Sequence, residues 1–216
     1  MNDPHASGAG GSEAPLTTPA NDADVAAAIA AERGELAAVL EGLPEPLWDA
    51  PTLCAGWRVC NVAAHLTMPF RYSIPKIAVE LLKARGNFHR MADRTARRDA
   101  SVMTPGELVE VLTANIHNPW KPPGGGLAGA LSHDVIHGLD ITVPLGIDRR
   151  IPQERLRIIL PDLGTPKRLR YSGSTCAASN YEPTISSGPW APVLRSTALD
   201  RTCCWRSAVA GCRPVT

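Results

Sequence analysis

Residues 21–44 read NDADVAAAIAAERGELAAVLEGLP, and this stretch indicates the fold class of the chain. Asn21 and Asp22 are residue types that cap the N-termini of helices, and Pro44 closes the stretch. Between them, apolar residues recur at the spacing of one helix face; they are Val25, Ile29, Leu36, Val39, Leu40 and Leu43. The stretch therefore predicts an amphipathic helix with one buried side.

Three more helical patterns follow before residue 150. One begins near Arg58, and Pro69 and Pro75 should kink or break it because proline has no backbone donor. Another begins at residues 104–107, TPGE, where Thr and Glu have the spacing of a capping box. The last runs from about residue 127 to 142. Because no pair of strands is recognisable here, the sequence predicts an all-α, up-and-down four-helix bundle.

Charge and hydropathy exclude several classes of protein. The chain of 216 residues has 22 Lys and Arg and 21 Asp and Glu, a net charge of +1, which argues against nucleic-acid or anionic-membrane binding. No apolar run approaches the roughly 20 residues of a membrane span. Residues 1–21 lack the basic start and apolar core of a secretory signal. We therefore expect a cytoplasmic protein, and the sequence does not indicate its oligomeric state.

Composition divides the chain into three parts. Residues 1–21 are rich in Gly, Ser, Pro and Thr and are expected to form a disordered leader. Residues 22–160 carry the helical patterns and should form the bundle. Residues 161–216 show no lasting helical or strand period and predict an irregular tail. Residues 164–216 hold seven Lys and Arg but two Asp and Glu, whereas residues 1–163 hold fifteen and nineteen.

Three histidines are candidate metal ligands. His133 and His137 lie four residues apart on one predicted helix, so their side chains share a face about 5–6 Å apart at Cβ. His65 lies among small apolar residues of an earlier helix, and ligands from different helices meet in bundle cores. Against this, most such histidine pairs are surface accidents, and a single histidine on an apolar face is more often a satisfied core residue. Spacing alone leaves both interpretations open.

Two motifs, however, resemble those of a known family. Residues 48–66 read WDAPTLCAGWRVCNVAAHL, and residues 132–146 contain SHDVIHGLDI followed by PLG. Both look like signatures of the mycothiol-dependent maleylpyruvate isomerase family, in which Leu-Cys-x-Gly-Trp-x-Val precedes the first metal histidine and His-Gly-x-Asp-Ile contains the last. Segments at 84–94 and 122–124 are also similar, so the resemblance covers about residues 22–155.

The resemblance implies a DinB-like metal-binding four-helix bundle in which His65, His133 and His137 hold a divalent metal, and histidine ligands of this kind favour Zn²⁺. His133 stands where the family typically has Glu. Asp140 either orients a ligand as an outer partner or is a simple surface carboxylate, and Asp134 is a fallback ligand. Three protein ligands leave a fourth position open, as in catalytic zinc sites.

The implied function is a thiol-dependent isomerase or S-transferase acting on a small electrophile, with mycothiol as the thiol cosubstrate. The alternative is a non-catalytic metal-binding helical bundle that has lost its C-terminal catalytic domain. Residues 161–216 do not resemble the second domain of the family, and we interpret them as a frameshifted remnant of it. A third hypothesis, a helical interaction module without metal, predicts that the three histidines lie far apart.

Overall fold

The computed structural model describes residues 20–163, and this part of the chain is all-α. Its elements are α1 (Asp22–Glu41), the short 3-10 helix η1 (Glu45–Asp49), α2 (Val59–Arg71), α3 (Ile74–Lys83), α4 (Phe88–Ala100), α5 (Pro105–Ala114), α6 (Gly126–Thr142) and α7 (Gln153–Leu163). The predicted leader lies outside the described residues, except for its last two, and so does the tail beyond residue 163. No strand forms within residues 20–163, which confirms the predicted fold class.

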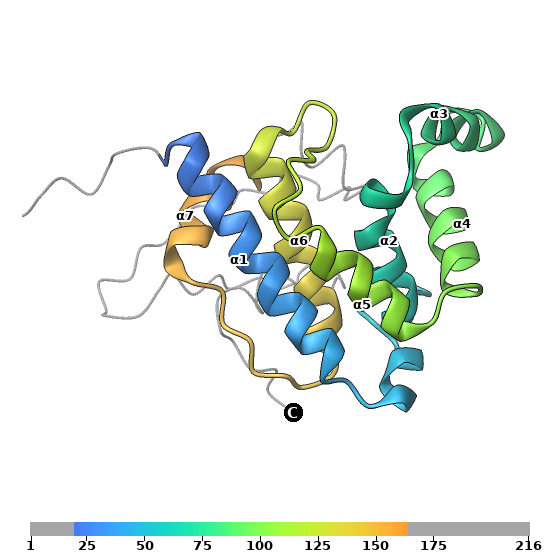
Figure 1. Ribbon diagram of the computed structural model, residues 1–216, viewed down its shortest axis with the longest axis horizontal. Coiled ribbons are helices and arrows are strands. Elements are labelled where there is room, and N and C mark those ends of the chain that lie inside the picture. The colour runs from blue at the N-terminus through green and yellow to red at the C-terminus, as the bar shows by residue number, and fades with distance from the viewer. Residues whose placement is uncertain (1–19, 164–216) are drawn as a thin grey trace, which may run out of the picture.

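Four helices form the central bundle (Figure 1). α1 packs against α5 and α6, and α2 packs against the same two helices, so that the four close into a ring. These are the four helices that the sequence patterns predict. The remaining helices lie outside the ring: α4 packs on α2, α3 on α4, and α7 on α1 and α6.

The apolar stripes of the four helices meet in two clusters inside the ring. One joins α1, α2 and α5 around Leu36, Leu66 and Leu108, all at most 1 % exposed. The other joins α1, α6 and α7 around Ile29, Leu131 and other residues. Burial of such stripes removes apolar surface from water, at about 25 cal/mol per Å², and this drives the helices together. Both α1 and α6 contribute to the two clusters, α6 through Ile141 in the first, so these two helices link the two sides of the bundle.

Local capping signals set several helix ends as predicted. Asn21 caps α1 with a capping box that Asp24 completes, and Thr104 caps α5 with a capping box that Glu107 completes. In the second pattern, Pro69 lies inside α2, which continues for two further residues. The last residue of α2 is Arg71, and Tyr72 is its C-cap. Pro75 lies in the first turn of α3. The predicted break is therefore a new helix start, which suits a residue without a backbone N–H.

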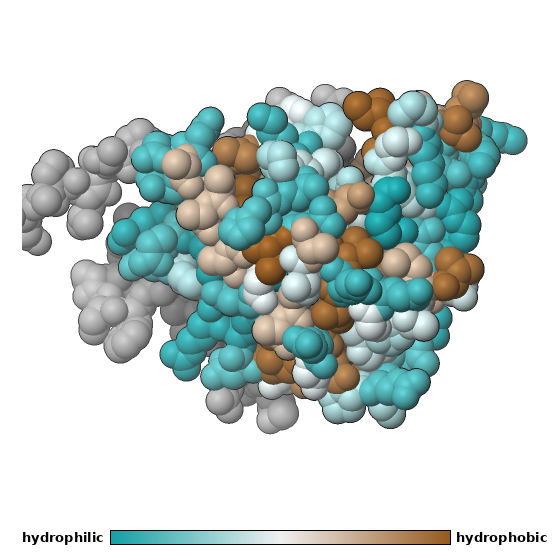
Figure 2. All heavy atoms as spheres, viewed as in Figure 1, coloured by the Kyte–Doolittle hydropathy of each residue, from teal (hydrophilic) through white to brown (hydrophobic). Residues whose placement is uncertain are grey.

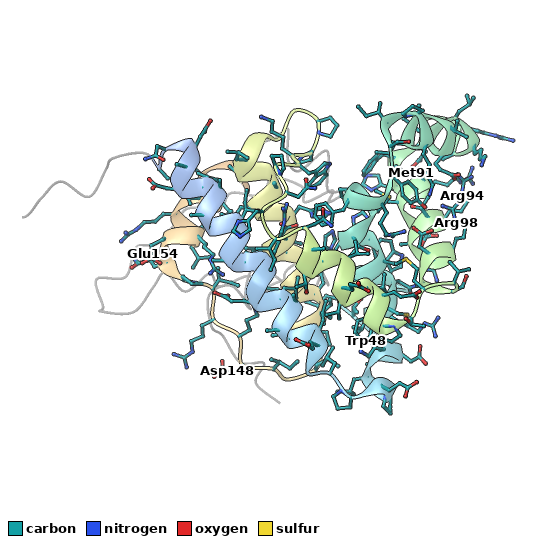
Figure 3. All side chains as sticks on the ribbon, viewed as in Figure 1. Trp48, Met91, Arg94, Arg98, Asp148 and Glu154 are labelled. Carbon is teal, nitrogen blue, oxygen red and sulfur yellow. The ribbon has the colours of Figure 1, made fainter. Side chains whose placement is uncertain are left out.

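The arginine-rich segment after α3 is the helix α4, and its arginines are not simply solvated. Arg94 and Arg98, labelled in Figure 3, form ion pairs with Glu80 of α3 at 2.6 and 3.2 Å. The opposite face of α4 is buried against α2 and includes Met91 and Thr95. α4 thus connects α3 to the ring by apolar contacts on one side and ion pairs on the other.

Apolar side chains also reach the surface at the outer end of the molecule (Figure 2). Ile74 and Leu82 of α3 are among the most exposed large apolar residues. Within the described residues, no helix is both long and apolar enough to cross a membrane.

Candidate metal centre

His65 lies in the most enclosed helix of the bundle. α2 packs against α4, α5 and α6, and nearly every residue from Val59 to Met68 is buried. A helix with neighbours on several sides must be apolar around most of its circumference. His65 is the one histidine in this run, and it is only 8 % exposed.

The three histidines predicted from the sequence come together. His65 extends from α2 toward His133 and His137, which lie one turn apart on the neighbouring helix α6. One ring nitrogen of each imidazole lies within 4.8 Å of the others. The ring centroids are 4.8–5.2 Å apart. This convergence contradicts the third hypothesis, a module in which the histidines are far apart.

The spacing of two of these nitrogens matches that of atoms bound to one ion. Nε2 of His65 and Nε2 of His133 are 3.4 Å apart. Two nitrogens held by one tetrahedral zinc at about 2.0–2.1 Å lie about 3.3–3.4 Å from each other. A direct hydrogen bond between nitrogens would ordinarily be about 2.7–3.2 Å long. The three histidines therefore form a group that could hold a metal ion.

A buried ion pair holds the ring of His133. Nδ1 of His133 is 2.9 Å from Oδ1 of the adjacent Asp134, and a carboxylate only accepts, so Nδ1 carries the proton. Nε of Arg33, on α1, donates to Oδ2 of Asp134 at 2.8 Å. Arg33 also donates to the backbone carbonyls of Asn115 and Asn118. Both oxygens of Asp134 are thus engaged behind His133, which leaves Nε2 as the free nitrogen of this ring.

A second carboxylate holds the ring of His137. Oδ2 of Asp140 lies 2.9 Å from Nδ1 of His137, so this imidazole also keeps Nε2 free. Cys54 donates its thiol hydrogen to the same oxygen at 3.1 Å. Such outer partners fix the tautomer and the orientation of a ligating imidazole. His65 differs, since its Nδ1 is buried without a hydrogen-bond partner.

Burial disfavours the charged form of two of the imidazoles, those of His65 and His133. Burial lowers the pKa of His65 well below its ordinary value of 6.5, and the neighbouring His137 and His133 lower it further. Burial also lowers the pKa of His133, although the hydrogen bond to Asp134 acts in the opposite direction. Only a neutral imidazole has a lone pair for a cation.

Two tryptophans border the site. The Trp57 ring meets His65 edge-on, and the Trp120 ring meets His133 in a similar way, with centroids 5.3 Å apart in each pair. Nε1 of Trp57 donates to Asp93 of α4 at 2.7 Å, which fixes this indole. The outer helix α4 therefore helps to shape the surroundings of His65.

Sequence reasoning missed two contacts of the site, those of Arg33 and Cys54. Arg33 carries a signal in hindsight, because it stands four residues after Ile29 on the buried face of α1. Its position within an apolar stripe indicates a buried partner of opposite charge. Cys54, in the connector before α2, is half-buried and lies beside the site. No pattern in the sequence around Cys54 predicts its contact with α6.

A comparison with known protein families gives a match that runs from α1 to α5. Residues 29–116 match the family model described as the mycothiol maleylpyruvate isomerase N-terminal domain, which confirms the family resemblance over this part. The match includes His65 but ends before α6 and its two histidines. No curated protein and no solved structure gives a significant match to the chain.

Proposed function

We propose that this chain binds a divalent metal ion and uses it in thiol-dependent chemistry, on the basis of the match between residues 29–116 and the mycothiol maleylpyruvate isomerase N-terminal domain. His65, His133 and His137 would hold the ion. The observation that carries the proposal is the convergence of their ring nitrogens within 4.8 Å.

The donor set favours zinc. Neutral imidazole is a common ligand of Zn²⁺, and tetrahedral coordination suits nitrogens about 3.3–3.4 Å apart. Asp134 and Asp140 support this choice as outer partners, because each accepts from the Nδ1 of one ligand ring. With three neutral ligands, the site would keep the full charge of the ion.

Three donors support an open position for a substrate. Within residues 20–163, no fourth His, Cys, Asp or Glu belongs to the group of His65. A bound divalent cation would stabilise the thiolate form of a small thiol at that position. The chain's own residues would orient that thiol: Trp57 and Trp120 flank the histidines with apolar ring surface.

The reaction class that fits is attack by the thiol sulfur on a small electrophile, as an isomerase or an S-transferase. Mycothiol is the proposed thiol and a small molecule the proposed acceptor, both by analogy with the family. A cytoplasmic location would suit a low-molecular-weight thiol and remains a prediction.

Metal analysis of the purified full chain tests the first part of the proposal. We expect about one zinc per wild-type chain and its loss in His65→Ala. His89→Ala is the matched control, because His89 is exposed on α4 and away from the site. Equal metal content in wild type and His65→Ala would contradict the proposal.

Turnover of the thiol and the electrophile tests the second part. As an isomerase, the zinc-loaded chain should isomerise maleylpyruvate only when mycothiol or another small thiol is present, and it should release the thiol unchanged. As an S-transferase, it should consume the thiol and the electrophile in equal amounts, and chelation should stop either reaction. No turnover with any such thiol would overturn the enzymatic proposal.

A non-catalytic metal-binding bundle is the second candidate, and the sequence of residues 161–216 favours it because it does not resemble the family's second domain. It predicts that zinc raises the melting temperature without turnover of any thiol. At a hundredfold excess of zinc over Kd, the free energy of unfolding should increase by about 2.7 kcal/mol.

A further inference from the structure

Cys54 occupies a special place in the connector between η1 and α2. It is not one of the three converging histidines, yet its Sγ lies 3.1 Å from Oδ2 of Asp140 and 3.9 Å from Nδ1 of His137. Asp140 receives both the thiol hydrogen and the Nδ1 hydrogen of His137 on the same oxygen. The thiol is thus linked to Nδ1 of the His137 ring by two hydrogen bonds that share one oxygen of Asp140.

These distances describe hydrogen bonds better than a second cation site. A sulfur and an oxygen bound to one zinc would lie about 3.5 Å apart, and a nitrogen and an oxygen about 3.3 Å apart. The observed separations are 3.1 and 2.9 Å, both shorter. Cys54, His137 and Asp140 do form a donor group, but in the histidine group the two Nε2 atoms that lie 3.4 Å apart match a shared ion.

The backbone aims the thiol at Asp140. Leu53 donates its backbone N–H to the carbonyl of Asp140 at 3.0 Å, which fastens the connector to α6. The backbone N–H of Trp57 donates to the carbonyl of Cys54. Gly56 closes this turn with a φ of +76°, a conformation that favours glycine. The backbone of Cys54 is therefore held on both sides, which places its side chain next to Asp140.

We propose that Cys54 is a positioning residue for the metal centre. By donating to Asp140, it holds the carboxylate in the orientation that accepts from Nδ1 of His137, and this keeps Nε2 of His137 turned toward His65 and His133. The inference rests on the proposed function, since it concerns the metal ligands.

The size of the effect follows from its distance to the ion. Loss of a direct outer partner of a metal ligand typically weakens metal binding by about 10–100-fold. Cys54 acts one step further out, so Cys54→Ala should weaken zinc binding by about 3–10-fold. Cys54→Ser keeps an O–H donor for Asp140 and should stay within about twofold of the wild type.

The experiment compares the wild type, Cys54→Ala, Cys54→Ser and Cys60→Ala in zinc titrations against a competing chelator. Cys60 is the matched control, because it is half-buried in α2 and belongs to neither donor group. The visible spectrum of the cobalt-substituted full chains reports the geometry of the site. We expect a changed spectrum only in Cys54→Ala.

Three results would overturn the proposal about Cys54 alone. The first is an unchanged zinc affinity in Cys54→Ala, with or without a lower melting temperature of the metal-free chain. The second is a Cys54→Ser variant as weak as Cys54→Ala. The third is a sulfur-to-cobalt charge-transfer band that both Cys54 variants abolish, because it would make Cys54 a ligand. A wild-type chain that binds no cation would instead overturn the proposed function, and this inference with it.

Discussion

Two carboxylates of this protein are almost equally hidden from solvent but have different surroundings. Asp134 in the ring is 3 % exposed, and Glu80 in the outer layer is 4 % exposed. Asp134 pairs with Arg33, whose side chain is 1 % exposed, and with His133. Glu80 pairs with Lys83, Arg94 and Arg98, all of which are partly open to water.

The comparison shows that burial of a carboxylate does not by itself define its role. Asp134 has one cation, so the loss of either partner leaves a charge in the bundle interior, where it is costly. Glu80 has three cations in contact with solvent, so each is replaceable and screened by salt. The first pair connects α1 to a candidate metal ligand, whereas the second group joins α3 to α4.

The largest expected effect is that of Arg33→Met. The substitution leaves Asp134 buried without its cation and should lower the free energy of unfolding by about 3–5 kcal/mol. Urea unfolding of the metal-free chain measures it. The double variant Arg33→Met/Asp134→Leu should recover much of the loss, since it removes both charges. A cost below about 1 kcal/mol in the single variant would contradict the comparison.

Asp134→Asn should weaken metal binding by about 10–100-fold. The amide has one accepting oxygen, which cannot serve both Arg33 and His133 as two carboxylate oxygens do. Chelator competition measures the change in Kd. Asp148→Asn is the control, because Asp148, labelled in Figure 3, is exposed and outside the site. If both variants bind zinc equally well, Asp134 does not support the metal centre.

Glu80→Gln should have a smaller effect that depends on pH. Hydrogen bonds from Lys83 and the two arginines hold the pKa of Glu80 at about 2, below its ordinary value of 4.5. Because the folded-state pKa is depressed, this stabilisation is present above pH 4.5 and is lost as the pH falls toward 2. We expect the variant to lose about 1–2 kcal/mol at pH 7.

Melting temperatures of wild type and Glu80→Gln at pH 7 and at acidic pH check this expectation. The difference between the two chains should narrow as the pH falls. A difference that is constant over this range would show that the charge of Glu80 does not stabilise the fold.

The smallest expected effect is that of Arg94→Met, since Lys83 and Arg98 still pair with Glu80. The cost should be below about 1 kcal/mol and should decrease at high salt. Urea unfolding at two salt concentrations measures it. A cost above 2 kcal/mol would remove the contrast with Arg33.

The parts of the fold that depend on local signals were predictable from the sequence. The caps at Asn21 and Thr104 and the four apolar stripes act over a few residues, so the pattern contains them. The start of α3 at Ile74 was less accessible, because the two prolines indicated a break without saying which side would be helical. The sequence analysis predicted no separate helix at the position of α7.

For the candidate site, the three histidines were predictable from the sequence, but their outer contacts were not. The spacing of His133 and His137 and the family motifs indicated the three histidines, and the bundle brings them together. The contacts of Arg33 with Asp134 and of Cys54 with Asp140 join residues 101 and 86 positions apart. Such contacts depend on how helices are rotated against each other, which no short pattern specifies.

The hydrogen bond between Leu53 and the carbonyl of Asp140 has one more consequence. It joins the segment leading into the His65 helix to the helix of the other two imidazoles. Under the proposed function, this backbone contact would hold the three side chains near one another, so that binding of the ion would carry less of the conformational entropy of gathering its ligands.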